Sequence, residues 1–112
     1  MNHRMNHKAA AHHFAAPTSV VFTILADPER AARWLGTGSG ESHRLSVVPA
    51  DLSVRWAPAG PDGWSGRALV RDAIGGGSVV YLEVIAAGTA GAHDRLLSDA
   101  ITRLVAEVAS FA

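Results

Sequence analysis

The chain has 112 residues, enough for one domain with a single core but too few for two. Hydrophobic residues make up 48% and charged residues 18%, which is typical of a globular protein and argues against disorder. Ten Lys and Arg side chains balance ten Asp and Glu side chains, and this zero net charge argues against a nucleic-acid partner, whose phosphates favour a basic surface.

The N-terminal residues 1–7 are polar and rich in histidine, and we expect a disordered tail before a single domain at 8–112. No apolar segment follows the tail, which argues against a secretory signal. No run reaches the roughly 20 apolar residues that span a bilayer, so we expect no membrane span. The absence of Cys excludes disulfides and Cys-based metal sites and is compatible with the cytoplasm, the localisation we expect.

The first half of the domain predicts one strand followed by two short helices. The strand is expected over 8–14 and the helices over 17–25 and 28–35. Each helix has Pro in its first turn, where the missing N–H leaves no hydrogen bond unmade. Asp27 stands immediately before the second helix and is a suitable N-cap.

The middle of the chain predicts antiparallel strands with one buried face. Leu52, Val54 and Trp56 alternate with polar residues, which is the period of a strand with one wet face. The glycines at 75–77 predict the turn of a hairpin. The strands are expected over 44–48, 52–56, 64–72 and 78–85.

The last segment predicts a long amphipathic helix. Its apolar stripe consists of Leu97, Ile101, Leu104, Val108 and Phe111, widened by Ala100 and Val105. A helix with so broad an apolar face must lie on an apolar surface, and the preceding strands supply one. We therefore expect an α+β helix-grip fold, in which a curved antiparallel sheet of about five strands holds this helix across its concave face.

Several segments together resemble the START-like superfamily, also called SRPBCC, which includes polyketide cyclase/dehydrase-like and chaperone-ATPase-activator-like proteins. The run Phe14-Ala15-Ala16-Pro17, then Val20-Val21-Phe22, and then Leu25-Ala26-Asp27-Pro28 through Trp34 is similar to the family's opening. The segment 45–56 is similar to its mid-sheet strands, and 76–82 resembles its last hairpin. The short interval 35–44 suggests a member shortened by about one hairpin.

The resemblance implies a small-molecule-binding protein with an apolar cavity for a hydrophobic or aromatic ligand, without a cofactor. In a helix-grip fold the core and the cavity wall share one face. The wall is then expected to consist of Phe22, Leu25, Trp34, Trp56, Val80, Leu82, Ile101, Leu104 and Val108. Trp56, on the clearly alternating strand, is the first candidate among them.

Three polar residues are candidate anchors for such a ligand: Arg67, Tyr81 and Glu83. Two strand orientations are open. If Val80, Leu82 and Val84 face the interior, Tyr81 and Glu83 point to water; in the opposite orientation they line the cavity. Because half-buried strands turn their apolar face inward, the first orientation is favoured.

Two further hypotheses concern function. The first is a cyclase- or dehydratase-like enzyme in which Tyr81, Glu83 or His43 assists; no residue is assigned as catalytic. The second is a protein-interaction module or homodimer related to chaperone-ATPase activators.

The sequence predicts no metal site, because His3, His7, His12 and His13 fit no metal-binding pattern. The glycines at 36, 38 and 40 lack the Lys of a phosphate-binding loop.

Overall fold

The computed structural model describes residues 8–35, 43–58, 64–85 and 90–111. In chain order these residues form β1 (Lys8–Phe14), α1 (Thr18–Ala26), α2 (Pro28–Leu35), β2 (His43–Val48), the short 3-10 helix η1 (Pro49–Asp51), β3 (Ser53–Pro58), β4 (Gly66–Asp72), β5 (Ser78–Val84) and α3 (Ala90–Phe111). This order is the one predicted from the sequence. No described helix is long and apolar enough to cross a membrane.

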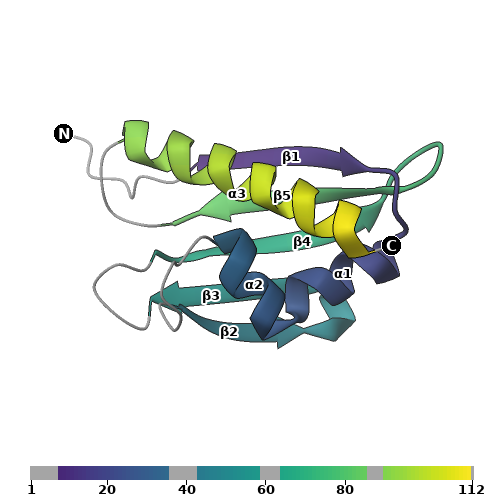
Figure 1. Ribbon diagram of the computed structural model, residues 1–112, viewed down its shortest axis with the longest axis horizontal. Helices are drawn as coiled ribbons and strands as arrows, with labels where there is room; N and C mark the ends of the chain where they lie inside the picture. The colour runs from purple at the N-terminus through teal and green to yellow at the C-terminus, as the bar shows by residue number, and fades with distance from the viewer. Residues whose placement is uncertain (1–7, 36–42, 59–63, 86–89, 112) are drawn as a thin grey trace.

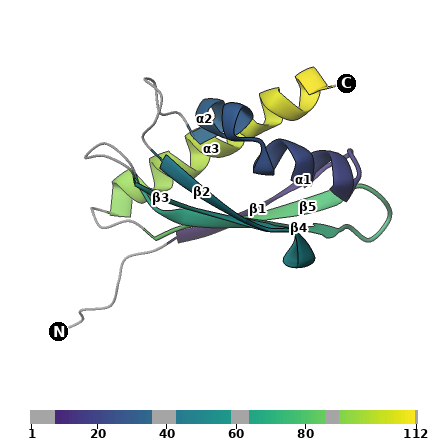
Figure 2. The same ribbon diagram turned by 90° about the horizontal axis from the view of Figure 1, so that it is seen from below.

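The five strands form one antiparallel sheet in the order β1-β5-β4-β3-β2. The first strand therefore lies beside the last one, at the edge opposite β2 (Figure 1). The helices α1, α2 and α3 cover one face of the sheet, which we call the inner face, and no described helix lies on the outer face (Figure 2). The predicted α+β arrangement, with two short helices after the first strand and a long C-terminal helix, is confirmed.

Local signals place the ends of several elements. The Asp27 Oδ1 atom accepts a hydrogen bond from the Glu29 N–H at 2.9 Å, as an N-terminal cap of α2. The turn between β4 and β5 has φ angles of +92°, +116° and +76° at 75–77, a conformation that favours glycine. The backbone of Leu52 has a left-handed conformation, with a φ angle of 52°. Strand β3 therefore begins at Ser53, one residue later than the predicted start at Leu52.

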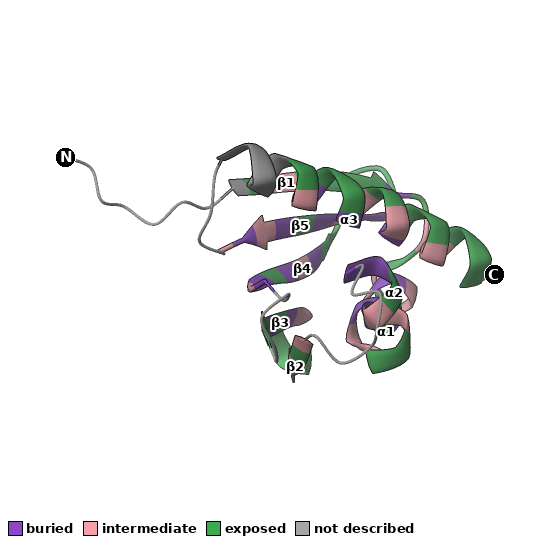
Figure 3. Ribbon diagram, turned by 60° about the vertical axis from the view of Figure 1, so that its left-hand side comes forward, coloured by how far each residue is buried: buried purple, intermediate pink, exposed green. Residues whose placement is uncertain are grey.

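The core lies between α3 and the inner face of the sheet. Leu97, Ala100 and Leu104 of α3 are buried there, while Ile101 and Val108 pack at its margin. Burial is concentrated on the sides of the strands and helices that face each other (Figure 3).

The predicted stripe of α3 is correct at its centre and wrong at two positions. Val105 is 39% exposed and Phe111 is 37% exposed. Successive helix residues turn by about 100°, so Val105 points away when its neighbour Leu104 points at the sheet. Phe111 contacts α2, where the Arg30 guanidinium carbon lies 5.0 Å from its ring centroid.

A pair of arginines ties α3 to α2. Glu107 accepts hydrogen bonds from Arg30 Nη1 at 2.9 Å and from Arg33 Nε at 3.0 Å. The Glu107 side chain is only 13% exposed, so this carboxylate is better shielded from water than an ordinary surface ion pair. The two contacts hold the C-terminal half of α3 above the interior.

Replacing Leu104 with Ala should lower the free energy of unfolding by about 2–5 kcal/mol, because it leaves a cavity between α3 and the sheet. Leu104→Asp should prevent folding, since it buries a charge. Val105→Ala is the matched control, because this neighbour is largely exposed. Chemical denaturation followed by circular dichroism measures both. Equal midpoints for the two Ala variants would contradict the packing of α3.

Candidate functional site

Four aromatic rings from four parts of the chain meet at one end of the interior. Trp34 comes from α2, Trp56 from β3, Trp64 from the residues before β4, and His43 from the start of β2. The ring centroids of Trp34 and Trp56 are 5.3 Å apart, those of Trp56 and Trp64 are 5.2 Å apart, and those of Trp64 and His43 are 5.8 Å apart. All three contacts are edge to face. We call these residues the aromatic cluster.

Gly66 makes room for the central ring of this cluster. It lies opposite Trp56 in the β3–β4 register. A Cβ atom at this position would lie 2.7 Å from Trp56 Cζ2 and would also overlap the Glu83 carbonyl oxygen. The indole of Trp56 can therefore lie flat against the backbone of β4 only because residue 66 has no side chain.

Three nitrogen atoms of the aromatic cluster are buried and have no hydrogen-bond partner among the described residues: Trp34 Nε1, Trp56 Nε1 and His43 Nδ1. The Trp64 backbone N–H donates to His43 Nε2 at 3.1 Å, so Nε2 carries the lone pair and Nδ1 carries the proton. All three unpartnered atoms are consequently donors. Each one left unsatisfied costs about 1–3 kcal/mol, which an acceptor atom of a ligand would recover.

The environment of His43 keeps its imidazole neutral. Burial lowers the pKa of this imidazole below its ordinary value, because the charged form is poorly solvated there. The hydrogen bond accepted by Nε2 also exists only in the neutral form. At neutral pH His43 therefore presents a buried N–H donor rather than a cation.

The structure places the predicted wall residues in the interior, together. Buried there are Leu25, Trp34, Trp56, Val80, Leu82 and Leu104, and half-buried at the margin are Phe22, Ile101 and Val108. They pack against one another as the core. Two further residues complete the aromatic cluster. The sequence analysis named Trp64 only as a large aromatic residue and His43 only as an acid–base candidate.

The three candidate polar anchors lie on the outer face instead. Strand β5 has Val80, Leu82 and Val84 buried and Tyr81 47% exposed, which is the favoured orientation of the two considered. Arg67 Nε donates to Glu83 Oε1 at 2.8 Å on the same outer face. These side chains are separated from the aromatic cluster by the sheet itself.

The remaining sequence candidates do not join this site. The glycines at 36, 38 and 40, together with His3 and His7, lie outside the described residues. On β1, the His12 ring lies 5.0 Å from that of Phe14, and His13 Nε2 lies 3.2 Å from the Gly76 carbonyl oxygen. The described part of the chain contains no group of three side chains arranged to hold a metal ion.

The chain matches no family model and no curated protein. It is similar in fold to TTHA0849 from Thermus thermophilus, with a TM-score of 0.65 and 15% identity over 94% of this chain and 98% of that one. It is also similar in fold to the Zhui aromatase/cyclase from Streptomyces sp. R1128, with a TM-score of 0.55 and 16% identity over 96% of this chain and 92% of that one. The chain shares its α+β fold with these two proteins. At sequence identities of 15% and 16%, the resemblance to START-like proteins concerns the fold alone.

The chain is also similar in fold to CV1439 from Chromobacterium violaceum, with a TM-score of 0.65 and 15% identity. That alignment covers 92% of this chain and 97% of the other. The likeness in fold therefore extends over nearly the whole length of each protein.

Replacing Gly66 with Ala should displace the Trp56 ring and lower the free energy of unfolding by about 1–3 kcal/mol, since the added methyl group overpacks the core. Tryptophan emission should shift as the cluster rearranges. Ser65→Ala, one residue away and lining the outer face, is the control. If both variants unfold at the same denaturant concentration, the close approach of Trp56 to β4 is wrong.

The stability of the protein should fall on acidification because of His43. The unfolded imidazole takes up a proton near pH 6.5, whereas the folded one does so only at lower pH. Between these two values the unfolded chain binds more protons, so the free energy of unfolding decreases as pH falls through this window and is unaffected above it. His43→Asn should flatten the profile below about pH 6.5, whereas Ser65→Ala, which removes no titratable group, should not. Parallel profiles for all three proteins would contradict a buried neutral His43.

Proposed function

We propose that this protein binds a small apolar or aromatic molecule that carries hydrogen-bond acceptor oxygens. The observation that supports this most directly is the set of three unpartnered donors in the aromatic cluster. A ligand with carbonyl or phenolic oxygens would satisfy donors that are otherwise left without a partner, and it would do so in surroundings from which water is excluded.

The apolar character of the ligand follows from the surrounding side chains. Trp34 is fully buried, and Trp56 and Trp64 are 2% and 6% exposed. Aromatic rings offer flat apolar surfaces, and edge-to-face contacts between them can be exchanged for contacts with a ligand ring. The cluster is therefore suited to a planar, conjugated body with oxygens at its periphery.

Binding requires the cluster to open. The four rings contact each other in sequence, so a ligand that reaches Trp34 Nε1 and Trp56 Nε1 has to separate at least one pair. The aromatase/cyclase among the structural neighbours makes an aromatic ligand a natural first choice, although the likeness is one of fold.

A matched pair of probes tests this proposal. 1-Acetonaphthone carries a carbonyl acceptor, and 1-ethylnaphthalene has nearly the same shape without one. We expect the ketone to bind more tightly than the hydrocarbon. Trp34→Phe or Trp56→Phe should lower the affinity for the ketone by about tenfold, since one hydrogen bond is lost, and should leave the affinity for the hydrocarbon unchanged. Calorimetric titration measures both affinities.

Trp64→Phe is the control for that experiment, because its indole nitrogen is not one of the unpartnered donors. It removes an indole of the same cluster without removing an unpartnered N–H. The proposal fails if neither probe binds, or if the preference for the ketone is the same in Trp34→Phe, Trp56→Phe and the parent.

A cyclase- or dehydratase-like activity is the second candidate, and His43 is the residue that favours it. Of the three residues offered for acid–base work, Tyr81 and Glu83 lie on the outer face and only His43 lies in the cluster. Its Nδ1–H could donate to a ligand carbonyl oxygen, so that solvent hydroxide removes a proton from the adjacent carbon and the resulting enolate oxygen is held by that hydrogen bond. Exchange of the ketone's methyl protons in D₂O, measured by NMR, should then be accelerated by the parent and not by His43→Asn.

A further inference from the structure

The charged residues of the sheet are distributed unevenly between its two faces. The outer-facing positions of β2, β3 and β4 carry Arg44, Arg55, Arg67 and Arg71, and the outer face of β5 carries one carboxylate, Glu83. A chain with zero formal net charge thus has a basic surface on the side of the sheet that no helix covers (Figure 2).

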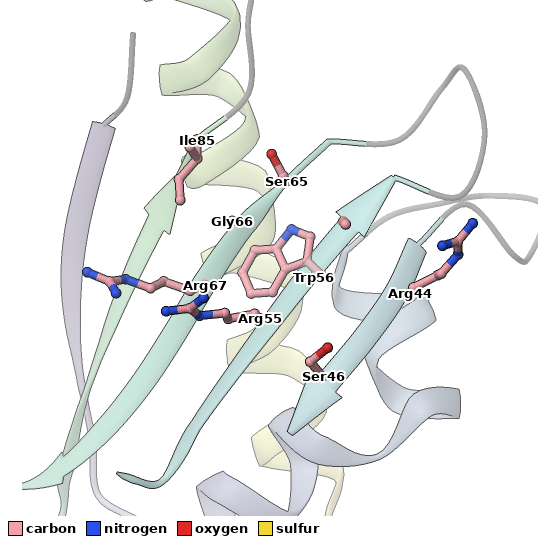
Figure 4. Close-up of a pocket in the computed structure, with 9 residues that line it drawn as sticks. Arg44, Ser46, Arg55, Trp56, Ser65, Gly66, Arg67 and Ile85 are labelled. Carbon is pink, nitrogen blue, oxygen red and sulfur yellow. The ribbon is translucent and has the colours of Figure 1, made fainter. Parts of the chain in front are cut away.

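Two of these arginines are directly opposed. Arg55 of β3 and Arg67 of β4 are partners in the strand register. Like charges in that position repel and destabilise the pairing. Figure 4 shows the two side chains running side by side toward β5. An anion placed between them would convert this repulsion into two charge-assisted contacts.

The existing partners leave part of this charge available. Arg67 is paired with Glu83, and Arg71 Nη1 donates to the carbonyl oxygens of Asp51 and Val70 at 2.8 Å and 2.9 Å. Among the described residues, neither Arg44 nor Arg55 has a hydrogen-bond or ion-pair partner. Arg55 and Arg67 against the Glu83 carboxylate leave a local charge of about +1 at neutral pH, and Arg44 extends away from them on the other side of Trp56 (Figure 4).

These arginines border a hollow of about 450 Å³ on the outer face. Its polar lining consists of Arg44, Ser46, Arg55, Ser65 and Arg67 (Figure 4). The volume is within the range of small-molecule sites, about 300–1,000 Å³. Two serine hydroxyls beside three guanidinium groups are the donors that a phosphate or carboxylate prefers.

An apolar hollow of similar size, about 450 Å³, adjoins it. Arg67 lines both hollows. The second is lined by Leu69 and Tyr81, which are register partners, by alanines of β1 that include Ala11, and by Glu83, whose carboxylate is paired with Arg67. The outer face therefore presents a row of charge next to a row of apolar side chains.

We propose that this outer face binds a phosphomonoester dianion with an apolar organic group. The phosphate lies between Arg55 and Arg67, and the organic group lies over Leu69 and Tyr81. The three terminal oxygens of a phosphomonoester can engage two guanidinium groups at once, which the two oxygens of a carboxylate do less fully. Trp56 of the aromatic cluster also lines the hollow (Figure 4), but the contacts proposed for the phosphate are made by Arg55 and Arg67 and require no ligand in the interior.

Phenyl phosphate and inorganic phosphate are the probes, titrated into the full chain at about pH 7.5, where the monoester is mostly a dianion. Phenyl phosphate should perturb NMR signals of outer-facing residues of β3, β4 and β5. Arg55→Gln should lower the affinity for phenyl phosphate by about tenfold or more. Arg55→Lys should lower it by less, because Lys keeps the positive charge but lacks the two-pronged donor geometry of the guanidinium group. Tyr81→Ala should weaken phenyl phosphate and leave inorganic phosphate unchanged.

Arg103→Gln is the matched control, since Arg103 is an exposed arginine of α3 on the opposite side of the molecule. Its affinity for phenyl phosphate should equal that of the parent, and thermal unfolding verifies that each variant is folded. Equal affinities of Arg55→Gln and Arg103→Gln overturn the proposal, as does benzoate binding as tightly as phenyl phosphate. A homodimer, seen by sedimentation, that Arg55→Gln dissociates would show instead that the outer face contacts a second copy.

Discussion

The packing of α3 against the inner face of the sheet holds the fold together. Leu97, Ala100 and Leu104 bury the helix stripe, and Glu107 joins its far end to α2 through Arg30 and Arg33. Burial of apolar area, at about 25 cal/mol per Å², stabilises the fold more than these partly exposed ion pairs do.

The aromatic cluster combines a favourable and an unfavourable contribution to stability. Burying three indoles is strongly favourable, since each ring removes a large apolar area from water. Leaving Trp34 Nε1, Trp56 Nε1 and His43 Nδ1 without acceptors is unfavourable. A core that needed only apolar bulk could use Phe or Leu at these places without that cost. Unsatisfied donors of one type, gathered in one place, are what distinguishes this end of the interior from ordinary core.

The sheet separates two chemically different surfaces. Strand alternation places Trp56 on the inner face and its neighbour Arg55 on the outer face. The same alternation places Leu82 inside and Glu83 outside. The inner face is closed by helices and offers buried donors, whereas the outer face is open and offers guanidinium groups. A substitution of Arg55 should thus affect the outer face and spare the interior, whereas Trp56 borders both, because it also lines the outer hollow.

Local sequence patterns were sufficient to predict the helices and strands and the faces they bury. The period of the Leu97-to-Val108 stripe predicted the terminal helix, and the alternation through Val80, Leu82 and Val84 predicted which side of β5 is buried. These predictions succeed because side-chain direction follows from the backbone period alone. The resemblance to START-like proteins added the expected order of elements.

Contacts between distant residues became known only from the folded chain. Nothing in the sequence indicates that the Trp64 amide donates to His43, that Gly66 leaves space for Trp56, or that Arg55 lies opposite Arg67. Val105 and Phe111 were assigned to the stripe because helical spacing cannot tell how wide the covered face is. Strand register and helix placement depend on pairing between remote segments, and a one-residue shift would change every such contact.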